Sequence, residues 1–224
     1  MKTIESNFTR KAHALSVYPL LFLFIILLAA SCSPEISSLP YLGVHETSEQ
    51  VVEGNTLVDT QYYQIPPFEL IDQDSVLLTE GQVKNKVYVA YFFFTSCPAT
   101  CPIMTSAMKR VYKMVGADQG FEIIAHTIDP KRDTPEKLKQ FAIKNEVEHQ
   151  NWHFLTGEMD YIYNLGMKGY YLSMGKHDAA PGGYIHSAKF ILVDQNRHIR
   201  GIYEGTDANE VAQMIEGIQF LLKG

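Results

Sequence analysis

The sequence predicts an α/β fold with a central mixed β-sheet flanked by helices and preceded by an N-terminal β-hairpin. Two continuous apolar, β-branched and aromatic runs, at residues 87–95 and 121–128, are typical of strands buried on both faces. Each run is followed by a stretch with helical features, at 102–115 and 134–145. This alternation, followed by a further hairpin and a closing helix, indicates an α/β protein.

The first elements of the domain are marked by turn and capping residues. Two apolar stretches, 65–71 and 76–78, flank Asp72-Gln73-Asp74-Ser75 and predict a hairpin. Pro102 is expected to open the helix that extends to about residue 115. Thr134 followed by Pro135 predicts the N-cap and first residue of the next helix.

The second half of the domain continues the pattern. It predicts a short strand at 152–155, a short helix at 159–167, a hairpin with strands at 188–193 and 199–204, and a closing helix at 209–222. A thioredoxin-like topology has this order of elements, although periodicity alone leaves other three-layer folds open. Residues 62–224 are enough for one domain.

Composition and charge narrow the class of protein. The chain has 224 residues, of which 46% are hydrophobic and 20% charged, as in an ordinary globular protein. It carries 19 basic and 25 acidic side chains and a net charge of −6. Nucleic-acid-binding proteins usually have a basic surplus, so we expect no nucleic-acid partner.

Residues 1–31 have the pattern of a secretory signal peptide. A positive flank precedes an uncharged apolar run at 14–31, which ends in small residues directly before Cys32. This arrangement resembles a bacterial lipoprotein signal, in which Cys32 becomes the lipid anchor. An uncleaved membrane anchor is the alternative, since the run is just long enough to span a bilayer. Both interpretations place the chain in the cell envelope, on the extracytoplasmic side and tethered to a membrane.

Residues 32–61 separate this segment from the domain. They are rich in Ser, Glu, Pro and Gly and have no sustained hydrophobic periodicity. We therefore expect a flexible tether that holds the domain away from the membrane.

Two cysteines mark the candidate site. Cys97 and Cys101 follow the first apolar strand directly, and Pro102 comes next. Residues four apart in the first turn of a helix lie on one face, so both sulfurs are expected to point to one place. A helix N-terminus favours thiolates, which suit either thiol–disulfide exchange or the binding of a soft metal ion. The three residues between the cysteines, one more than in Cys-x-x-Cys redox motifs, leave room for a metal ion.

Three motifs resemble those of the SCO/SenC family. They are residues 93–102 (FFTSCPATCP), 127–135 (TIDPKRDTP) and 186–194 (HSAKFILVD), which occur in the family's order. Members of this family are membrane-tethered copper proteins with a thioredoxin-like fold, linked to cytochrome c oxidase assembly. The resemblance implies that Cys97, Cys101 and His186 bind one copper ion, as Cu(I), with Cu(II) left open.

The resemblance also draws attention to residues around the metal ligands. Asp129 is a candidate partner that orients the imidazole of the histidine ligand, with a loop-tying or capping role as the alternative. Asp133 is the better candidate for tying the loop. Family members often carry acidic residues where this chain has Ala99 and Ile185. The site is therefore expected to be less negatively charged, which should reduce its affinity for Cu(II) more than its affinity for Cu(I).

Other potential ligands are assigned structural roles. His126 lies within the second apolar strand and is predicted to be a hydrogen-bonded core residue. His149 and His153 are expected to be solvated or structural. Met174 is expected to pack in the core, and the glycine-rich loop that follows it, up to His186, is expected to be mobile.

The leading interpretation is a copper metallochaperone that delivers copper to a copper-accepting subunit of a respiratory oxidase. The alternative is a thiol–disulfide oxidoreductase, in which Cys97 attacks and Cys101 resolves, and which reduces cysteines of the copper-accepting partner. A copper or redox sensor is a third interpretation that no residue favours.

Overall fold

A computed structural model describes residues 37–52, 55–116, 120–147 and 150–223. The predicted signal peptide 1–31 and the predicted lipid anchor Cys32 lie outside these ranges. Among the described residues, no helix combines the length and the apolar character needed to cross a membrane. All of the described residues belong to one compact unit.

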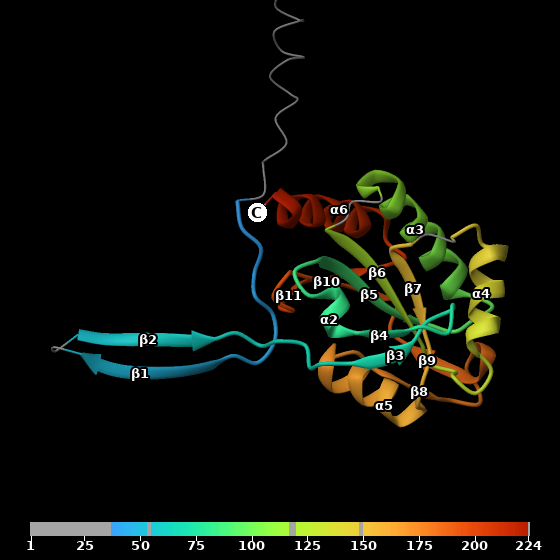
Figure 1. Ribbon diagram of the computed structural model, residues 1–224, viewed down its shortest axis with the longest axis horizontal. Helices are drawn as coiled ribbons and strands as arrows, with labels where there is room; N and C mark the ends of the chain where they lie inside the picture. Colours follow the sequence, from blue (N-terminus) through green and yellow to red (C-terminus); the bar gives the residue numbers. More distant parts are fainter. Residues whose placement is uncertain (1–36, 53–54, 117–119, 148–149, 224) are drawn as a thin grey trace, which may run out of the picture. The chain divides into compact units, whose positions relative to one another are not determined.

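The centre of the fold is a five-stranded mixed sheet in the order β11-β10-β5-β6-β7 (Figure 1). Strands β5 (Val87–Phe93), β6 (Phe121–Thr127) and β7 (Trp152–Leu155) are parallel. Strand β10 (Lys189–Val193) is antiparallel to β5 and to the edge strand β11 (Ile199–Glu204). The predicted α/β fold with a mixed sheet is confirmed.

The two apolar runs form the centre of this sheet. Every residue of β5 and β6 is buried, which explains why neither strand alternates between apolar and polar residues. Their register pairs Val87 with Phe121 and Phe93 with Thr127, so both strands end at the same edge. The loops that follow β5 and β6 therefore meet at that edge.

Helices cover both faces of the sheet (Figure 1). On one face, the ring centroid of Phe141 on α4 lies 5.3 Å from that of Phe93. On the same face, the ring centroid of Tyr112 on α3 lies 6.4 Å from that of Trp152. On the other face, Phe92 packs against Tyr170, which follows α5 and a π-helical turn. The helices are α2 (Glu80–Val83), α3 (Thr100–Val115), α4 (Pro135–Lys144), α5 (Met159–Asn164) and α6 (Ala208–Lys223).

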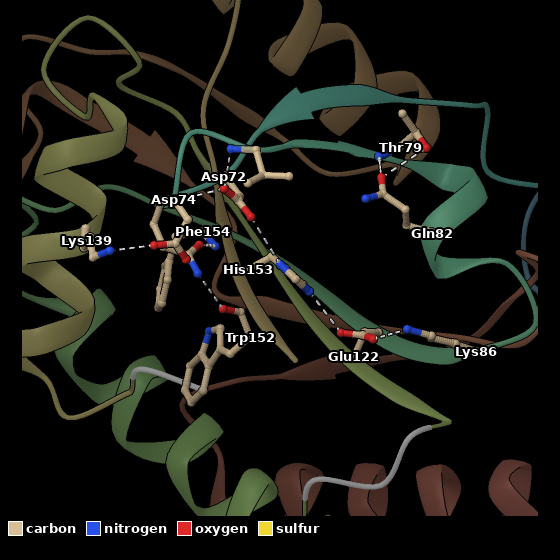
Figure 2. Close-up of polar contacts among 12 residues, drawn as sticks. Asp72, Asp74, Thr79, Gln82, Lys86, Glu122, Lys139, Trp152, His153 and Phe154 are labelled. Atoms are coloured by element: carbon tan, nitrogen blue, oxygen red, sulfur yellow. Dashed lines mark hydrogen bonds and ion pairs between the residues drawn. The ribbon is translucent and has the colours of Figure 1, made fainter. Parts of the chain in front are cut away.

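The predicted N-terminal hairpin is confirmed but shorter, as β3 (Glu69–Ile71) and β4 (Leu77–Thr79). Its turn is closed by Asp72, whose Oδ1 accepts hydrogen bonds from the backbone N–H groups of Asp74 and Val76. Figure 2 shows the Asp72 carboxylate beside His153 of β7, with Oδ2 3.8 Å from Nδ1. His153 thus has a structural role, as expected.

The same histidine connects to the centre of the sheet. Its Nε2 lies 3.1 Å from Oε2 of Glu122 on β6, and Glu122 also forms an ion pair with Lys86 (Figure 2). Burial raises the pKa of Glu122, but the hydrogen bonds from His153 and Lys86 outweigh it, so the pKa is lowered. This network stabilises the position of the β3–β4 hairpin against β6 and β7.

The segment 32–61, which is expected to be a flexible tether, contains two strands. Strands β1 (Glu46–Val52) and β2 (Asn55–Gln61) pair as an antiparallel hairpin. Val51, Leu57 and Val58 are all more than half exposed, so neither strand has a buried face that would give an apolar periodicity. Earlier in this segment, Arg200 donates hydrogen bonds to the carbonyl groups of Leu39 and Pro40, so contacts with the domain begin before residue 62.

His126 is fully buried, as predicted, but the prediction that its ring is hydrogen-bonded is wrong. Its ring stacks on Phe92 with centroids 4.8 Å apart, and it lies 5.6 Å from the Tyr170 ring. Neither ring nitrogen has a hydrogen-bond partner among the described residues. Burial lowers the pKa of His126 to about 3, so the imidazole stays neutral in the aromatic core.

Candidate metal centre

The cysteines lie in the connection between β5 and α3. Asp133, in the loop after β6, holds this connection: its carboxylate accepts hydrogen bonds from the backbone N–H of Thr95 at 3.0 Å and from the hydroxyl groups of Thr95 and Thr127. Asp133 is only 1% exposed. The predicted loop-tying role of Asp133 is confirmed, and it fixes the start of the cysteine segment.

The predicted position of the cysteines is partly wrong. Helix α3 begins at Thr100, so Cys101 lies in its first turn, whereas Cys97 lies before the helix in a turn closed by its own N–H and the carbonyl of Phe94. The two sulfurs still converge, since their Sγ atoms lie within 4.8 Å of each other, and the N–H of Cys101 also donates to Sγ of Cys97 at 3.5 Å. The i and i+4 spacing thus brings the sulfurs together without a shared helical face.

His186 completes the site from a distant part of the chain. It is the last residue of β9 (Tyr184–His186), which pairs with β8 (Met174–Lys176) in a short hairpin. Its Nε2 lies 3.4 Å from Sγ of Cys101, and the three potential ligand atoms all lie within 4.8 Å of one another. Within the described ranges, this is the only group of three or more His, Cys, Asp or Glu residues arranged in this way.

The segment between Met174 and His186, expected to be a mobile loop, contains the short β8–β9 hairpin. Met174 is directly opposite His186 in the register and is partly buried against the core, as predicted. A Cβ added to Gly166 would lie 2.2 Å from the terminal methyl of Met174, which shows how closely this side chain packs. The segment from 177 to 183 makes the turn between the two strands.

The imidazole of His186 is oriented by a backbone carbonyl. Its Nδ1 lies 3.1 Å from the carbonyl oxygen of Ser187, which can only accept a hydrogen bond. Nδ1 therefore carries the proton, and the lone pair of Nε2 faces the sulfurs. The ring of Phe94 packs against the imidazole with centroids 5.8 Å apart.

Asp129 does not have the expected contact with the imidazole. Its Oδ1 accepts a hydrogen bond of 2.8 Å from the hydroxyl of Tyr184, and its Oδ2 lies 3.1 Å from Nε of Arg132. Tyr184 lies two residues before His186 on β9, so Asp129 holds the hairpin rather than the ring. No sequence pattern pointed to Ser187 or Tyr184, because a backbone acceptor leaves no side-chain signature and Tyr184 lies in a segment expected to be mobile.

The two thiols have different environments. Burial raises the pKa of Cys97, but hydrogen bonds from the backbone N–H groups of Cys101, Ala99 and Thr100 and from the Cys101 thiol outweigh it, so the pKa is lowered. Burial raises the pKa of Cys101 well above its ordinary value. Cys97 is the half-buried thiol of the pair, whereas Cys101 is 2% exposed.

The donor set is suited to a soft metal ion. Burial lowers the pKa of His186, so its imidazole is neutral and able to donate a lone pair near pH 7. With bonds of about 2.3 Å to sulfur and about 2.0 Å to nitrogen, a three-coordinate ion needs ligand atoms roughly 4 Å apart, and the observed spacing within 4.8 Å allows this. Two thiolates and one imidazole select Cu(I) or Zn²⁺ by ligand softness. Ala99 and Ile185 leave the ligand group without a carboxylate.

These features define a thioredoxin-like α/β protein with a two-thiolate, one-imidazole site for a soft metal. Residues 59–223 match the family model described as SCO1/SenC, and the chain therefore belongs to the SCO1/SenC family. This is a family of copper-binding proteins that function in cytochrome c oxidase assembly.

Solved structures agree in fold. A SCO1/SenC family lipoprotein from Bacillus anthracis is 29% identical, with a TM-score of 0.66 over 71% of this chain and 95% of that one. BsSco, described as a cytochrome c oxidase assembly protein with a disulfide switch, is also 29% identical, with a TM-score of 0.62 over 70% and 92% of the two chains. Bradyrhizobium japonicum ScoI, solved with copper bound, is 23% identical, with a TM-score of 0.59 over 70% and 99%.

Proposed function

We propose that this protein is a copper metallochaperone that holds Cu(I) at Cys97, Cys101 and His186 and delivers it to a copper-accepting subunit of a respiratory oxidase. The observation that carries this proposal is the position of His186, whose Nε2 lies 3.4 Å from Sγ of Cys101. Disulfide exchange does not require an imidazole with a free lone pair facing the sulfurs. Binding of a soft metal ion does.

Delivery proceeds by ligand exchange. Cys97 is the more accessible sulfur, so an incoming thiolate of the acceptor binds the ion there first. Each acceptor thiol that binds loses a proton, and each thiolate of this protein that is released gains one. The valence of copper does not change in this exchange. The short β8–β9 hairpin lets His186 release the ion without disturbing the sheet.

The proposal includes a membrane tether. The positive flank, apolar run and small residues before Cys32 support a lipid anchor at that residue, with an uncleaved anchor as the alternative. Either anchor holds the copper site on the extracytoplasmic side of a membrane. Metabolic labelling with a palmitate analogue tests this: incorporation lost in Cys32→Ala supports the lipid anchor, and incorporation that persists contradicts it.

A transfer experiment tests the delivery function. The reduced full chain is loaded with Cu(I) and mixed with a purified copper-accepting oxidase domain in its dithiol form. Metal and free thiols are then counted on both proteins after separation. The proposal predicts that copper moves and that the total number of free thiols, counted after the metal is removed, stays constant. Oxidation of this protein's cysteines without movement of copper would contradict it.

The unequal environments of the cysteines favour a second candidate, a thiol–disulfide oxidoreductase. The Cys97 thiolate attacks a partner disulfide and releases one partner thiolate. Cys101 then attacks the mixed disulfide and releases the second, so that two electrons pass to the partner and a Cys97–Cys101 disulfide remains. A stable mixed disulfide trapped by Cys101→Ser supports this activity. If His186→Ala lost disulfide reduction together with copper binding, the two functions would not be separable.

A further inference from the structure

A groove lies beside the cysteine pair, between α3 and α4. It is a cavity of about 300 Å³, and both sulfur-bearing residues, Cys97 and Cys101, line it. Phe94 and Phe141 supply apolar surface, and Lys137 and Lys144 of α4 contribute amino groups. His186 is not among the lining residues, so the groove leads to the cysteines rather than to the imidazole.

The positive charge continues along α3. A second hollow shares Pro102 and Asn145 with the first and is lined by Lys109, Arg110 and Lys113. We call the two hollows together the basic groove. Among the described residues, neither hollow is lined by Asp or Glu. This is unusual for a chain whose net charge is −6.

Most of these cations are not neutralised by the protein itself. Lys109 lies 3.4 Å from the carboxylate of Glu146 and donates to the carbonyl of Asn145. Within the described part of the chain, Lys137, Lys144, Arg110 and Lys113 form no ion pair, and all four are exposed. On α4, residues 137, 140, 141 and 144 have the spacing of one helical face, so the lysines flank Phe141.

We infer that the basic groove docks an acidic segment of the protein that accepts copper, and that docking brings the acceptor's metal-binding thiol to Cys97. This inference rests on the proposed function, since it assigns a partner chemistry to the same site. Charge complementarity selects acidic side chains, and the aromatic floor of Phe94 and Phe141 accommodates an apolar residue between them. A protein segment fits better than a nucleic acid, because the groove ends at two thiols.

The direction of approach has a consequence for exchange. An acceptor bound in the groove would meet Cys97 and Cys101, which line it, whereas His186 does not line it. The thiolates are therefore exchanged first, and His186 is released last. This order keeps the ion coordinated throughout the transfer.

Charge reversal tests the inference. The probe is a short fluorescent peptide rich in Asp and Glu with serine in place of cysteine, and its binding to the reduced, metal-free full chain is followed by anisotropy. The test variant is Lys137→Glu/Lys144→Glu. The matched control is Lys84→Glu/Lys168→Glu, which changes the net charge equally at exposed positions outside the groove. Cu(I) binding is measured for each protein in parallel.

We expect the groove variant to bind the peptide at least about tenfold more weakly, with little change in the control, and binding to weaken at high salt. A peptide with Asn and Gln in place of the acidic residues should bind poorly to all proteins. Equal losses in both variants, or no loss in the groove variant, would overturn the inference. The Cu(I) measurement separates the two kinds of failure. A groove variant that binds both Cu(I) and the peptide normally refutes only the docking surface. A wild-type protein that binds no Cu(I) refutes the proposed function.

Discussion

The Sγ atom of Cys101 lies 3.4 Å from Nε2 of His186, although the two residues are 85 positions apart in the chain. The contact joins the first turn of α3 to the end of β9 in the short two-stranded β8–β9 hairpin. Three structural supports maintain it: Asp133 ties the cysteine segment, the Ser187 carbonyl orients the imidazole, and Asp129 holds Tyr184 on the same strand as the histidine.

Tyr184→Phe tests whether Asp129 supports the site through β9. The change removes the hydroxyl that donates to Asp129 and leaves a buried carboxylate with one partner fewer, at a cost of about 1–3 kcal/mol in the free energy of unfolding. We expect Cu(I) affinity to fall by about three- to tenfold, measured by competition with a chelator. Tyr163→Phe is the control, because that hydroxyl donates to the backbone carbonyl of Ile128 and not to the Asp129 carboxylate. Equal effects of both changes on copper affinity would contradict the assignment.

The two thiols should differ in reactivity. Because the pKa of Cys97 is lowered and that of Cys101 is raised, Cys97 becomes a thiolate at a lower pH. In the reduced, metal-free protein, iodoacetamide should modify Cys97 first, and its rate should rise with pH at values below the ordinary thiol pKa. Mass spectrometry of quenched samples identifies the modified residue. Earlier modification of Cys101 would show that the described environments are wrong.

Asp133→Asn should destabilise both fold and site. The buried carboxylate accepts hydrogen bonds from Thr95 and Thr127, and an amide replaces one acceptor oxygen with a donor. We expect the free energy of unfolding in urea to fall by about 2–4 kcal/mol. Asp59→Asn, at an exposed position on β2, should change it by less than about 0.5 kcal/mol. A small effect of Asp133→Asn would mean that the loop is held by other contacts.

Glu122 should make stability depend on pH. Its pKa in the folded protein is lowered despite burial, because His153 and Lys86 donate to it. The stabilisation is therefore complete above the ordinary carboxyl pKa of 4.5 and is lost as pH falls through the lower folded value. Unfolding measured across acidic pH should show this slope in wild type and a smaller slope in Glu122→Gln. Identical slopes would contradict the role of the network in Figure 2.

Features with a distinct sequence signature were predictable. The buried strands β5 and β6 appear in the sequence as continuous apolar runs, and the cysteine and histidine motifs identify the three converging residues. The hairpins β1–β2 and β8–β9 were not predictable, because neither has a clear apolar alternation. The position of Cys97 before α3 depends on where the helix begins, which spacing alone does not determine. The partner of the imidazole is a backbone carbonyl, and every residue has one.

Cu(I) binding to the reduced full chain tests the central claim most directly. Wild type, His186→Ala and His177→Ala are compared in competition with a chelator, since His177 is an exposed histidine just after β8 and outside the ligand group. We predict one Cu(I) per chain for all three proteins, with affinity at least about tenfold lower for His186→Ala, because altering even the outer partners of metal ligands costs about 10–100-fold. Equal affinity in wild type and His186→Ala would contradict the three-ligand copper site and leave disulfide chemistry as the function of the cysteines.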